Sequence, residues 1–450
     1  MRNDDFMRRA IELAKKGTGL VNPNPLVGCV IVKDGAIIAE GYHEKYGGFH
    51  AERNALLSTD ADVCGAEMYV TLEPCCHTGK TPPCTDIIIE RGIGKVYVGS
   101  DDPNPLVAGH GIELLRESGI DVETHVLKEE CDALNEIFFH YIQTKMPFVA
   151  MKYAMSLDGK IAIYAPVTHH AAMDELDSAA MRRGRRADDN LRAERIMITG
   201  PDAYTHVHAL RKKYRAILIG VGTVINDDPV LNYRGSDAPA DPGVLGSAAG
   251  DPGVLGAAAY STGGAGTQDL FAQAGYDPIR IILDSHLRIP LTSKIIKTAS
   301  TIPTVIACSE DAFDIDSDTS VADANMSATV KKRMITEAGA RVIILPSEKP
   351  SDDDDSGLLS RRTDCRVSFD ALFKKLGESG IDSVLVEGGS KIHSSLFERP
   401  DLINRVYAYI APKIIGKGLP PIDSEATPFE LSDTKLITLG KDICLTGRVN

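Results

Sequence analysis

The chain has 450 residues, which at about 150 residues per domain suggests three units, or two large ones with insertions. Its hydrophobic fraction of 43% and charged fraction of 25% are typical of globular proteins, so sizeable cores are possible. The net charge of −14 argues against a general binder of nucleic acid or anionic membrane, whose affinity comes largely from Lys and Arg. No apolar run approaches the ~18 residues of a membrane span.

The N-terminus and the cysteines indicate the compartment. The first residues are amphipathic and include two acids, a pattern that is not typical of a secretory signal. The nine cysteines are odd in number and mostly scattered, so we do not expect a disulfide framework. We expect a reducing, cytoplasmic location instead. Three of them, Cys75, Cys76 and Cys84, crowd together, and clustered thiols in such a chain more often bind metal or react.

Residues 1–146 alternate between helical and strand patterns. Apolar spacing predicts a helix over 6–16, and β-rich runs over 27–32 and 36–42 are joined by Asp34-Gly35, a hairpin signal. This hairpin makes the expected α/β sheet mixed and not purely parallel. Further elements are predicted as helices over 50–57, 85–91, 111–118 and 129–145, and as strands over 67–72, 95–99 and 120–126.

Met146-Pro147 marks a break, after which a second α/β series occupies residues 147–450. Segments near 165–195, 235–275 and 351–364 interrupt this second domain with polar or low-complexity sequence, so we expect them to be mobile surface insertions. The predicted elements are a helix over 203–213 and strands over 148–153, 216–220, 278–284, 304–308, 340–345, 383–387 and 405–410.

The strongest chemical signal is a set of potential metal ligands. His50, Cys75 and Cys84 offer one imidazole and two thiolates, which suit zinc and leave a fourth position for water. Zinc lowers the pKa of such a water to about 7, and a carboxylate beside the ligand histidine, here Glu52, can shuttle protons. This division of roles is the scheme of the zinc deaminases.

Two features leave alternatives open at this point. The general deaminase signature places two residues between its cysteines, whereas eight separate Cys75 from Cys84, and Cys76 and His77 are spare candidates for ligation. The set could instead be a structural zinc clip or inert buried thiols. A closed structural site needs four protein ligands, however, and would not explain the position of Glu52 beside His50.

The second half contains two strands that run into glycine turns. One is 384–390, followed by the start of a helix over 391–397, and the other is 216–223. A glycine turn before a helix exposes backbone N–H groups that can bind phosphate, so the two turns could flank a dinucleotide. No Gly-x-Gly-x-x-Gly fingerprint follows a first strand, so a standard Rossmann unit is not supported.

Several motifs resemble the bifunctional deaminase/reductase family of riboflavin biosynthesis. In the first half these are residues 22–28 (Asn-Pro-Asn-Pro-Leu-Val-Gly), 71–84 and 102–111, and the long cysteine spacing is that family's own variant. In the second half the motifs at 151–160, 198–201, 222–223, 227–229, 282–285, 386–389 and 411–416 continue the resemblance in order. It covers nearly the whole chain apart from the three insertions. It implies a cytidine-deaminase-like α/β/α domain with a mixed sheet, followed by a dihydrofolate-reductase-like α/β domain.

For the first domain, the resemblance implies hydrolytic deamination of a phosphoribosylated diaminopyrimidinone. His50, Cys75 and Cys84 would hold Zn²⁺, and Glu52 would be the general acid/base. Substrate contacts would come from polar residues of the same domain, namely Asn24, His43, His77 and Lys80.

For the second domain, the resemblance implies that NADPH reduces the ribose to a ribityl chain. Lys152 and Asp227 would lie near the transferred hydride or proton. Residues implied to face the substrate are Arg211, Leu231, Arg234 and Glu387. Residues implied to line NADPH are Ala154, Thr199, Thr223, Asp227, Ser285, Gly389, Ser390, Lys391, Ile392, His393, Ser394 and Ser395. Related enzymes associate through this half, so a homodimer or homotetramer is expected.

Three hypotheses follow. The first is a bifunctional enzyme that deaminates and then reduces. The second keeps the deaminase but treats the second half as a degenerate binding or scaffold module. The third is a deaminase of tRNA or of free nucleosides with an appended domain. The negative charge and the absence of Trp count against the polynucleotide version.

Overall fold

The computed structural model describes residues 3–79, 81–166, 191–194, 197–234, 277–313, 326–348, 366–424 and 427–449. The chain divides into two compact units: Met1–Leu134 with Asn232–Asp277 and Glu378–Ile381, and Asn135–Leu231 with Pro278–Gly377 and Asp382–Asn450. The predicted insertions lie almost entirely outside the described residues. Only the strands β7 (Ala162–Pro166) and β8 (Leu191–Glu194), which pair antiparallel, fall at the ends of the first insertion.

The first unit is built on a five-stranded mixed sheet in the order β2-β1-β3-β4-β5. Its strands are β1 (Gly28–Lys33), β2 (Ala36–Tyr42), β3 (Glu67–Leu72), β4 (Lys95–Ser100) and β5 (Asp121–Thr124). β1 pairs antiparallel with both β2 and β3, and the remaining pairs are parallel. The predicted hairpin is confirmed, because Asp34 and Gly35 both have positive φ (54° and 74°), as a two-residue type I′ turn requires.

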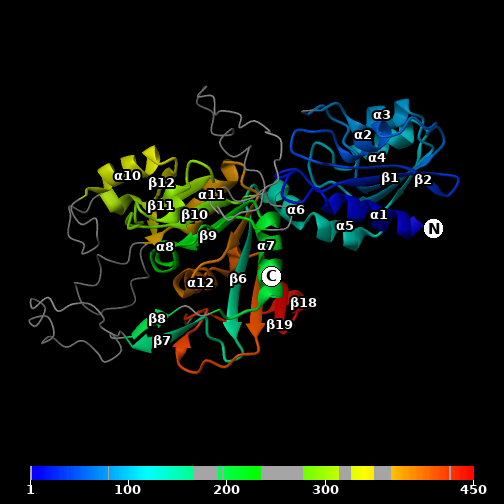
Figure 1. Cartoon of the computed structure of the whole chain (residues 1–450). Helices are drawn as coiled ribbons and strands as arrows, with labels where there is room; N and C mark the ends of the chain where they lie inside the picture. Colours follow the sequence, from blue (N-terminus) through cyan, green and yellow to red (C-terminus); the bar gives the residue numbers. More distant parts are fainter. Residues whose placement is uncertain are drawn as a thin grey trace, which may run out of the picture. The chain divides into compact units, whose positions relative to one another are not determined.

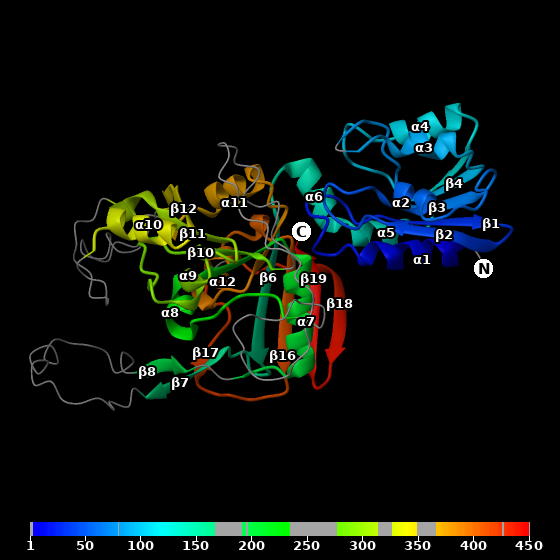
Figure 2. The same ribbon diagram turned by 45° about the horizontal axis from the view of Figure 1, so that its top comes forward.

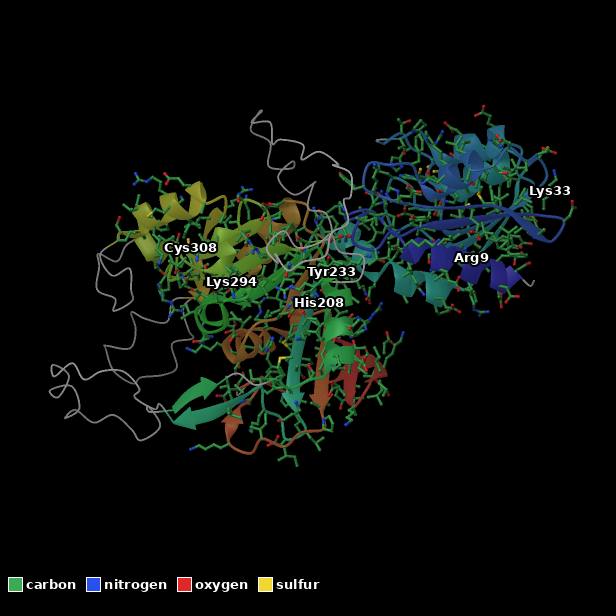
Figure 3. All side chains as sticks on the ribbon, viewed as in Figure 1. Arg9, Lys33, His208, Tyr233, Lys294 and Cys308 are labelled. Carbon is green, nitrogen blue, oxygen red and sulfur yellow. The ribbon has the colours of Figure 1, made fainter. Side chains whose placement is uncertain are left out.

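Helices cover both faces of this sheet (Figures 1 and 2). α1 (Asn3–Lys15) and α5 (Lys128–Leu134) lie on one face, and α2 (Ala51–Leu57), α3 (Cys84–Glu90) and α4 (His110–Glu117) on the other. On the α1 face, Phe6 and Met7 pack against the stacked rings of Tyr69 and Tyr97. Arg9, labelled in Figure 3, is a residue of α1 and joins it to β2 by donating to Glu40 at 2.7 Å. The predicted three-layer α/β/α domain is therefore confirmed.

One predicted element is wrong. The apolar pattern over 129–145 predicted a single long helix, but α5 ends at Leu134 and α6 (Glu136–Thr144) begins after Asn135. Asn135 has φ −113° and ψ 20°, outside the helical region. Asn is unfavourable inside helices because its side chain competes for backbone groups, and it is favoured at their ends. The break separates the two units, since α6 belongs to the second.

The second unit is built on a nine-stranded sheet in the order β12-β11-β10-β9-β15-β6-β16-β19-β18. The seven strands from β12 to β16 run parallel, and β19 and β18 add an antiparallel edge that the sequence did not predict. The strands are β6 (Phe148–Ser156), β9 (Ala216–Gly220), β10 (Ile279–Leu283), β11 (Thr304–Ser309), β12 (Arg341–Leu345), β15 (Ser383–Val386), β16 (Arg405–Ala411), β18 (Leu431–Leu439) and β19 (Asp442–Val449). Short strands β13 (Ser347–Glu348), β14 (Arg366–Val367) and β17 (Gly418–Leu419) complete the unit.

Two apolar clusters hold this sheet to its helices. α7 (Pro201–Lys213) runs along β6, β16 and β19 (Figure 2), where Ala203, Val207 and Leu210 pack against Phe148 and Tyr409. A second cluster joins β9, β10 and β11 to their helices through residues such as Ile219, Ile282 and Ile306. The remaining helices are α8 (Val221–Asp227), α9 (Lys294–Lys297), α10 (Ala328–Glu337), α11 (Phe369–Glu378) and α12 (Ser390–Phe397), with 3₁₀ turns at Glu310–Phe313 and Pro400–Leu402. Among the helices of the described ranges, none is long and apolar enough to cross a membrane.

Candidate active sites

The structure brings the three predicted metal ligands together. His50 Nδ1 lies 3.4 Å from Cys75 Sγ and 3.4 Å from Cys84 Sγ, and the three donor atoms all lie within 4.8 Å of one another. Among the described residues this is the one such group of His, Cys and acidic side chains. All eight described cysteines are free thiols, so no disulfide competes for the two sulfurs in that part of the chain.

Local structure explains how residues far apart in sequence converge. His50 is the residue before α2, so it and Glu52 share the first turn of one helix. Cys84 opens α3, and its backbone N–H donates to the Cys75 carbonyl at 3.0 Å. The same N–H lies 3.4 Å from Cys75 Sγ. His50 and Cys84 therefore lie at the starts of two helices, and Cys75 is hydrogen-bonded to the start of the second.

The charges of the cluster interact strongly. Hydrogen bonds from Cys84 and His50 outweigh burial and lower the pKa of Cys75 to about 4. The hydrogen bond to Cys75, then the nearby charges, raise the pKa of His50 against the effect of burial. Burial, followed by the charge of Cys75, raises the pKa of Glu52 to about 7. A thiolate beside the imidazole is the form in which cysteine binds metal.

The donor set fits zinc. With Zn–S of about 2.3 Å and Zn–N of about 2.0 Å, tetrahedral ligation places nitrogen and sulfur about 3.5 Å apart, close to both observed separations. Glu52 is 3% exposed, and its Oε2 has no hydrogen-bond partner among the residues that the structure describes. A buried carboxylate oxygen without a partner is costly in the folded protein alone. Its position beside the cluster fits a group that hydrogen-bonds a bound water or substrate.

Two predicted substrate residues lie next to the cluster. Asn24 Nδ2 is 3.1 Å from His43 Nε2, and the His43 ring meets the His50 ring edge-on at 5.4 Å between centroids. Burial lowers the pKa of His43, so its ring is neutral at pH 7. His43 Nδ1 lies 2.9 Å from the Phe49 carbonyl, which can only accept, so Nδ1 donates and Nε2 accepts from Asn24.

The other two predicted substrate residues belong to the loop between Cys75 and Cys84. His77 Nδ1 is buried and has no hydrogen-bond partner within the described ranges. Lys80 lies outside the described residues.

The structure also places two acids near the cluster that were not predicted as site residues, Glu73 and Asp102. Burial, together with the charges of Glu73 and Cys75, raises the pKa of Asp102 to about 6. A sequence signal existed, because Pro-Asn-Pro-Leu-Val follows Asp102 just as it follows Asn22.

In the second unit, the two glycine turns lie side by side. β9 and β15 are neighbouring parallel strands, so the turns that follow them share one edge of the sheet. A Cβ on Gly220 would lie 3.0 Å from Ile392, and one on Gly388 only 2.6 Å from it, so α12 packs tightly on both turns. A Cβ on Gly389 would lie 3.7 Å from Thr223 Oγ1. Two predicted NADPH contacts, Thr223 and Gly389, are therefore neighbours.

Three of the charged residues predicted for the reductase site also meet. Arg211 donates two hydrogen bonds, of 2.7 and 3.0 Å, to the carboxylate of Glu387. Lys152 Nζ lies 3.9 Å from the same carboxylate. Burial alone would raise the pKa of Glu387, but the charges of Arg211 and Lys152 outweigh it and lower the pKa to about 2. Lys152 also lies 5.5 Å from the centre of the Tyr409 ring. These side chains come from β6, α7, β16 and the end of β15.

The residues of α12 differ in exposure. Ser390 and His393 are buried, whereas Lys391 is exposed. Burial, followed by the charge of Lys152, lowers the pKa of His393 to about 4, so this imidazole is neutral at pH 7. Ser394 Oγ donates to the Ser390 carbonyl at 2.8 Å, and Ser395 Oγ to that of Lys391 at 3.0 Å. The hydroxyls of Ser394 and Ser395 thus donate to carbonyls of α12 itself. The first turn of α12 packs on the glycine turns after β9 and β15.

The remaining predicted residues are more dispersed. Leu231 has φ of 56°, and its side chain is buried in the core cluster of β9, β10 and β11. Arg234 belongs to the other compact unit, where its Nε donates to Asn232 at 3.0 Å. Asp227 ends α8, Thr199 precedes α7, Ala154 lies in β6, and Ser285 follows β10, where its carbonyl accepts from Ser309. The segment after Asp227 is held by Asp228, which accepts from the backbone N–H of Lys294, a residue labelled in Figure 3.

Comparison with known proteins identifies both halves. Residues 1–100 match the family model of the cytidine and deoxycytidylate deaminase zinc-binding region, and residues 147–445 match that of the RibD C-terminal domain. The riboflavin biosynthesis protein RibD of Actinobacillus pleuropneumoniae is 42% identical over 98% of this chain and 94% of its own length. The Escherichia coli protein of the same name is 30% identical over 99% of both.

Solved structures agree along the whole length. An Acinetobacter baumannii RibD aligns over 99% of this chain and 98% of its own, with 28% identity and a TM-score of 0.69. The Thermotoga maritima diaminohydroxyphosphoribosylaminopyrimidine deaminase/5-amino-6-(5-phosphoribosylamino)uracil reductase aligns equally far, with 32% identity and a TM-score of 0.65. Because both domains match, these findings favour the bifunctional enzyme over a deaminase with a degenerate second half. The chain belongs to the RibD family, the bifunctional enzymes of riboflavin biosynthesis that join a zinc-dependent deaminase to an NADPH-dependent reductase.

Proposed function

We propose that this chain deaminates the phosphoribosylated diaminopyrimidine named for its Thermotoga maritima relative and then reduces the ribosyl group of the product to a ribityl chain with NADPH. We assign deamination to the domain of residues 1–146 and reduction to that of residues 147–450. The proposal is supported by the two family models, one in each half, and by a full-length likeness to RibD proteins.

In the deaminase domain, His50, Cys75 and Cys84 would hold the zinc ion. Zinc supplies hydroxide at neutral pH by acidifying a bound water. Glu52 takes up a proton at Oε2 and returns it to the amino nitrogen that leaves as ammonia. Its Oε2 is suited to this role because, among the described residues, it has no other hydrogen-bond partner. Asn24 and His43 would orient the substrate ring, because their mutual hydrogen bond fixes both side chains beside His50. His77 and Lys80 are the other proposed substrate contacts.

In the reductase domain, the turns at Gly220–Thr223 and Gly388–Ser390, with the first turn of α12, would hold NADPH. NADPH supplies the hydride. Lys152, Arg211 and Glu387 would bind and orient the ribosyl substrate, because they form a buried charged group at the same end of the sheet. Asp227 would lie near the transferred hydride or proton. The other proposed contacts are Ala154, Thr199, Ser285 and residues 391–395 for NADPH, and Leu231 for substrate.

We further propose a homodimer or homotetramer in the cytoplasm, with no nucleic-acid partner. The negative net charge supports the last point.

The convergence of His50, Cys75 and Cys84 beside the unpartnered Oε2 of Glu52 is the observation that carries the proposal. Its test is a panel of substrates given to the zinc-loaded protein: the phosphoribosyl diaminopyrimidine, cytidine and adenosine. We expect ammonia from the first alone, followed by oxidation of added NADPH. Ammonia from a nucleoside but not from the phosphoribosyl compound would overturn the proposal. Deamination without any NADPH oxidation would support the proposed deaminase and contradict the proposed reductase.

A further inference from the structure

Glu73 is a buried acid at the end of β3 that no step of the proposed chemistry uses. Its side chain accepts four backbone N–H groups. Oε1 accepts from Gly111 at 3.0 Å and Ile112 at 3.2 Å, and Oε2 accepts from Gly109 at 3.0 Å and Asp102 at 3.4 Å. The residue is 3% exposed. A buried carboxylate needs hydrogen bonds or a counter-charge, and here the four N–H groups meet that need.

All four donors come from one stretch of chain, Asp102 to Ile112. Gly109, Gly111 and Ile112 form the start of α4, whose first N–H groups have no acceptors within the helix itself. The contact is close, because a Cβ on Gly111 would lie 2.0 Å from the Pro74 carbonyl. Glu73 and Pro74 directly precede the ligand Cys75. The Glu73 carboxylate therefore binds both ends of the segment 102–109, at Asp102 and Gly109. It thereby joins this segment to the chain just before the ligand Cys75.

This segment, 102–109, contacts the two residues Glu73 and Cys76, which flank the metal ligand Cys75. Asp102 is 8% exposed, and its backbone N–H donates to Glu73, which lies two residues before the ligand Cys75. Further along, Cys76 Sγ lies 3.8 Å from the Leu106 carbonyl. The Leu106 side chain is 64% exposed. The segment thus contacts the chain on both sides of Cys75, through Glu73 and Cys76, and it carries a buried acid and an exposed apolar side chain.

We propose that Glu73 is a positioning residue of the deaminase. By binding Asp102, Gly109, Gly111 and Ile112 at once, it holds the segment 102–109 as a wall of the substrate site. This inference rests on the proposed deamination, and it assigns to Glu73 an effect on substrate binding, with no contact to the reacting atoms.

The test compares Glu73→Gln with Glu67→Gln in the full-length, zinc-loaded protein. Glu67 lies at the other end of the same strand, where it accepts from Tyr69 Oη at 3.0 Å, so it is a matched control for loss of a charge on β3. Gln in place of Glu73 puts an amide NH₂ against backbone donors and breaks at least two of the four bonds. We expect KM for the phosphoribosyl diaminopyrimidine to rise at least about tenfold in Glu73→Gln, because bonds to a buried charge are strong. The fall in kcat should be much smaller, and zinc content and NADPH-dependent reduction should stay at parent values.

A second readout does not depend on activity. Hydrogen exchange of the peptide covering 102–112 should speed up at least about tenfold in Glu73→Gln and stay unchanged in Glu67→Gln. Unchanged KM together with unchanged exchange would overturn the proposal, and so would a loss of zinc in proportion to the loss of activity. If Glu73→Gln does not fold, the same KM measurement is made on Glu73→Asp, which keeps the charge on a shorter side chain. A raised KM in that variant supports the proposal, and a parental KM overturns it. A parent protein that releases no ammonia would contradict the proposed function instead.

Discussion

Replacing Glu387 by Gln removes a buried negative charge that is paired with two cations of the reductase domain. The Glu387 side chain is 8% exposed and that of Arg211 is 16% exposed, and two hydrogen bonds join them. Lys152 adds a second positive charge at 3.9 Å. Gln keeps the shape of the side chain but removes its charge, so Arg211 and Lys152 both lose a nearby carboxylate.

The expected cost follows from the pKa of Glu387. The folded protein lowers this pKa from 4.5 to about 2, so the carboxylate contributes about 3 kcal/mol to stability at pH 7, at about 1.4 kcal/mol per unit. Breaking one side of a buried ion pair typically costs about 3–5 kcal/mol, which agrees. Because the folded pKa is the lower one, this stabilisation is present above about pH 4.5 and is lost as the pH falls towards 2. About half of it is left at pH 3.

The assay must report the second unit separately, since a chain of two units need not unfold in one step. Hydrogen exchange of peptides from β6, β15 and β16 in increasing urea gives that unit's free energy of unfolding. Glu387→Gln, Arg211→Met and the double variant complete a double-mutant cycle. We expect Glu387→Gln to lose about 3 kcal/mol at pH 7 and progressively less below pH 4. A loss under about 1 kcal/mol at pH 7, or one that does not shrink in acid, would show that the pairing of Glu387 with Arg211 and Lys152 does not stabilise this unit.

Three further perturbations test the two activities and the stability of the second unit. Asp227→Ala should cripple NADPH oxidation while ammonia release continues, and a fall of both activities in a folded protein would contradict the division into two domains. Glu136→Gln should destabilise the second unit by about 3 kcal/mol in urea, because Glu136 is the buried counter-charge of Lys213 (2.9 Å) and Arg405 (2.7 Å). Since the folded protein lowers the pKa of Glu136, this loss should be largest above pH 4.5. Removing the metal with a chelator should stop ammonia release but not reduction of the deaminated compound, and added zinc should restore the first activity.

Much of the fold could be predicted because its signals are local. Asp34-Gly35 specifies its hairpin with two residues, and the predicted strands at 67–72 and 216–220 agree with β3 and β9 to the residue. The candidate metal ligands could be picked out as well, because a histidine and thiols outside a disulfide framework have few other uses in such a pattern, and the structure brings these three side chains together. Spacing alone left the purpose of the set open, and the geometry of His50 with Cys75 and Cys84 supports the zinc site.

The features that sequence could not predict depend on contacts between distant residues. Glu73 looks like a polar residue after a strand, and nothing nearby in sequence shows that its acceptors are filled by residues 102–112. Arg280 interrupts the apolar pattern of β10, yet it is fully buried and donates to the carbonyls of Val230, Ile295 and Ile302 and to two threonine hydroxyls. The helix break at Asn135 escaped prediction because the apolar spacing continues through it.

In the proposed deaminase site, His50, Cys75 and Cys84 hold a zinc ion whose chemistry depends on the proton carried by Glu52. Glu52→Gln in the zinc-loaded protein, with metal content and ammonia release measured on the same sample, tests it most directly. We expect one zinc per chain, as in the parent, and no detectable ammonia from the phosphoribosyl diaminopyrimidine. Ammonia release at the parental rate, or a parent protein that binds no zinc, would contradict it.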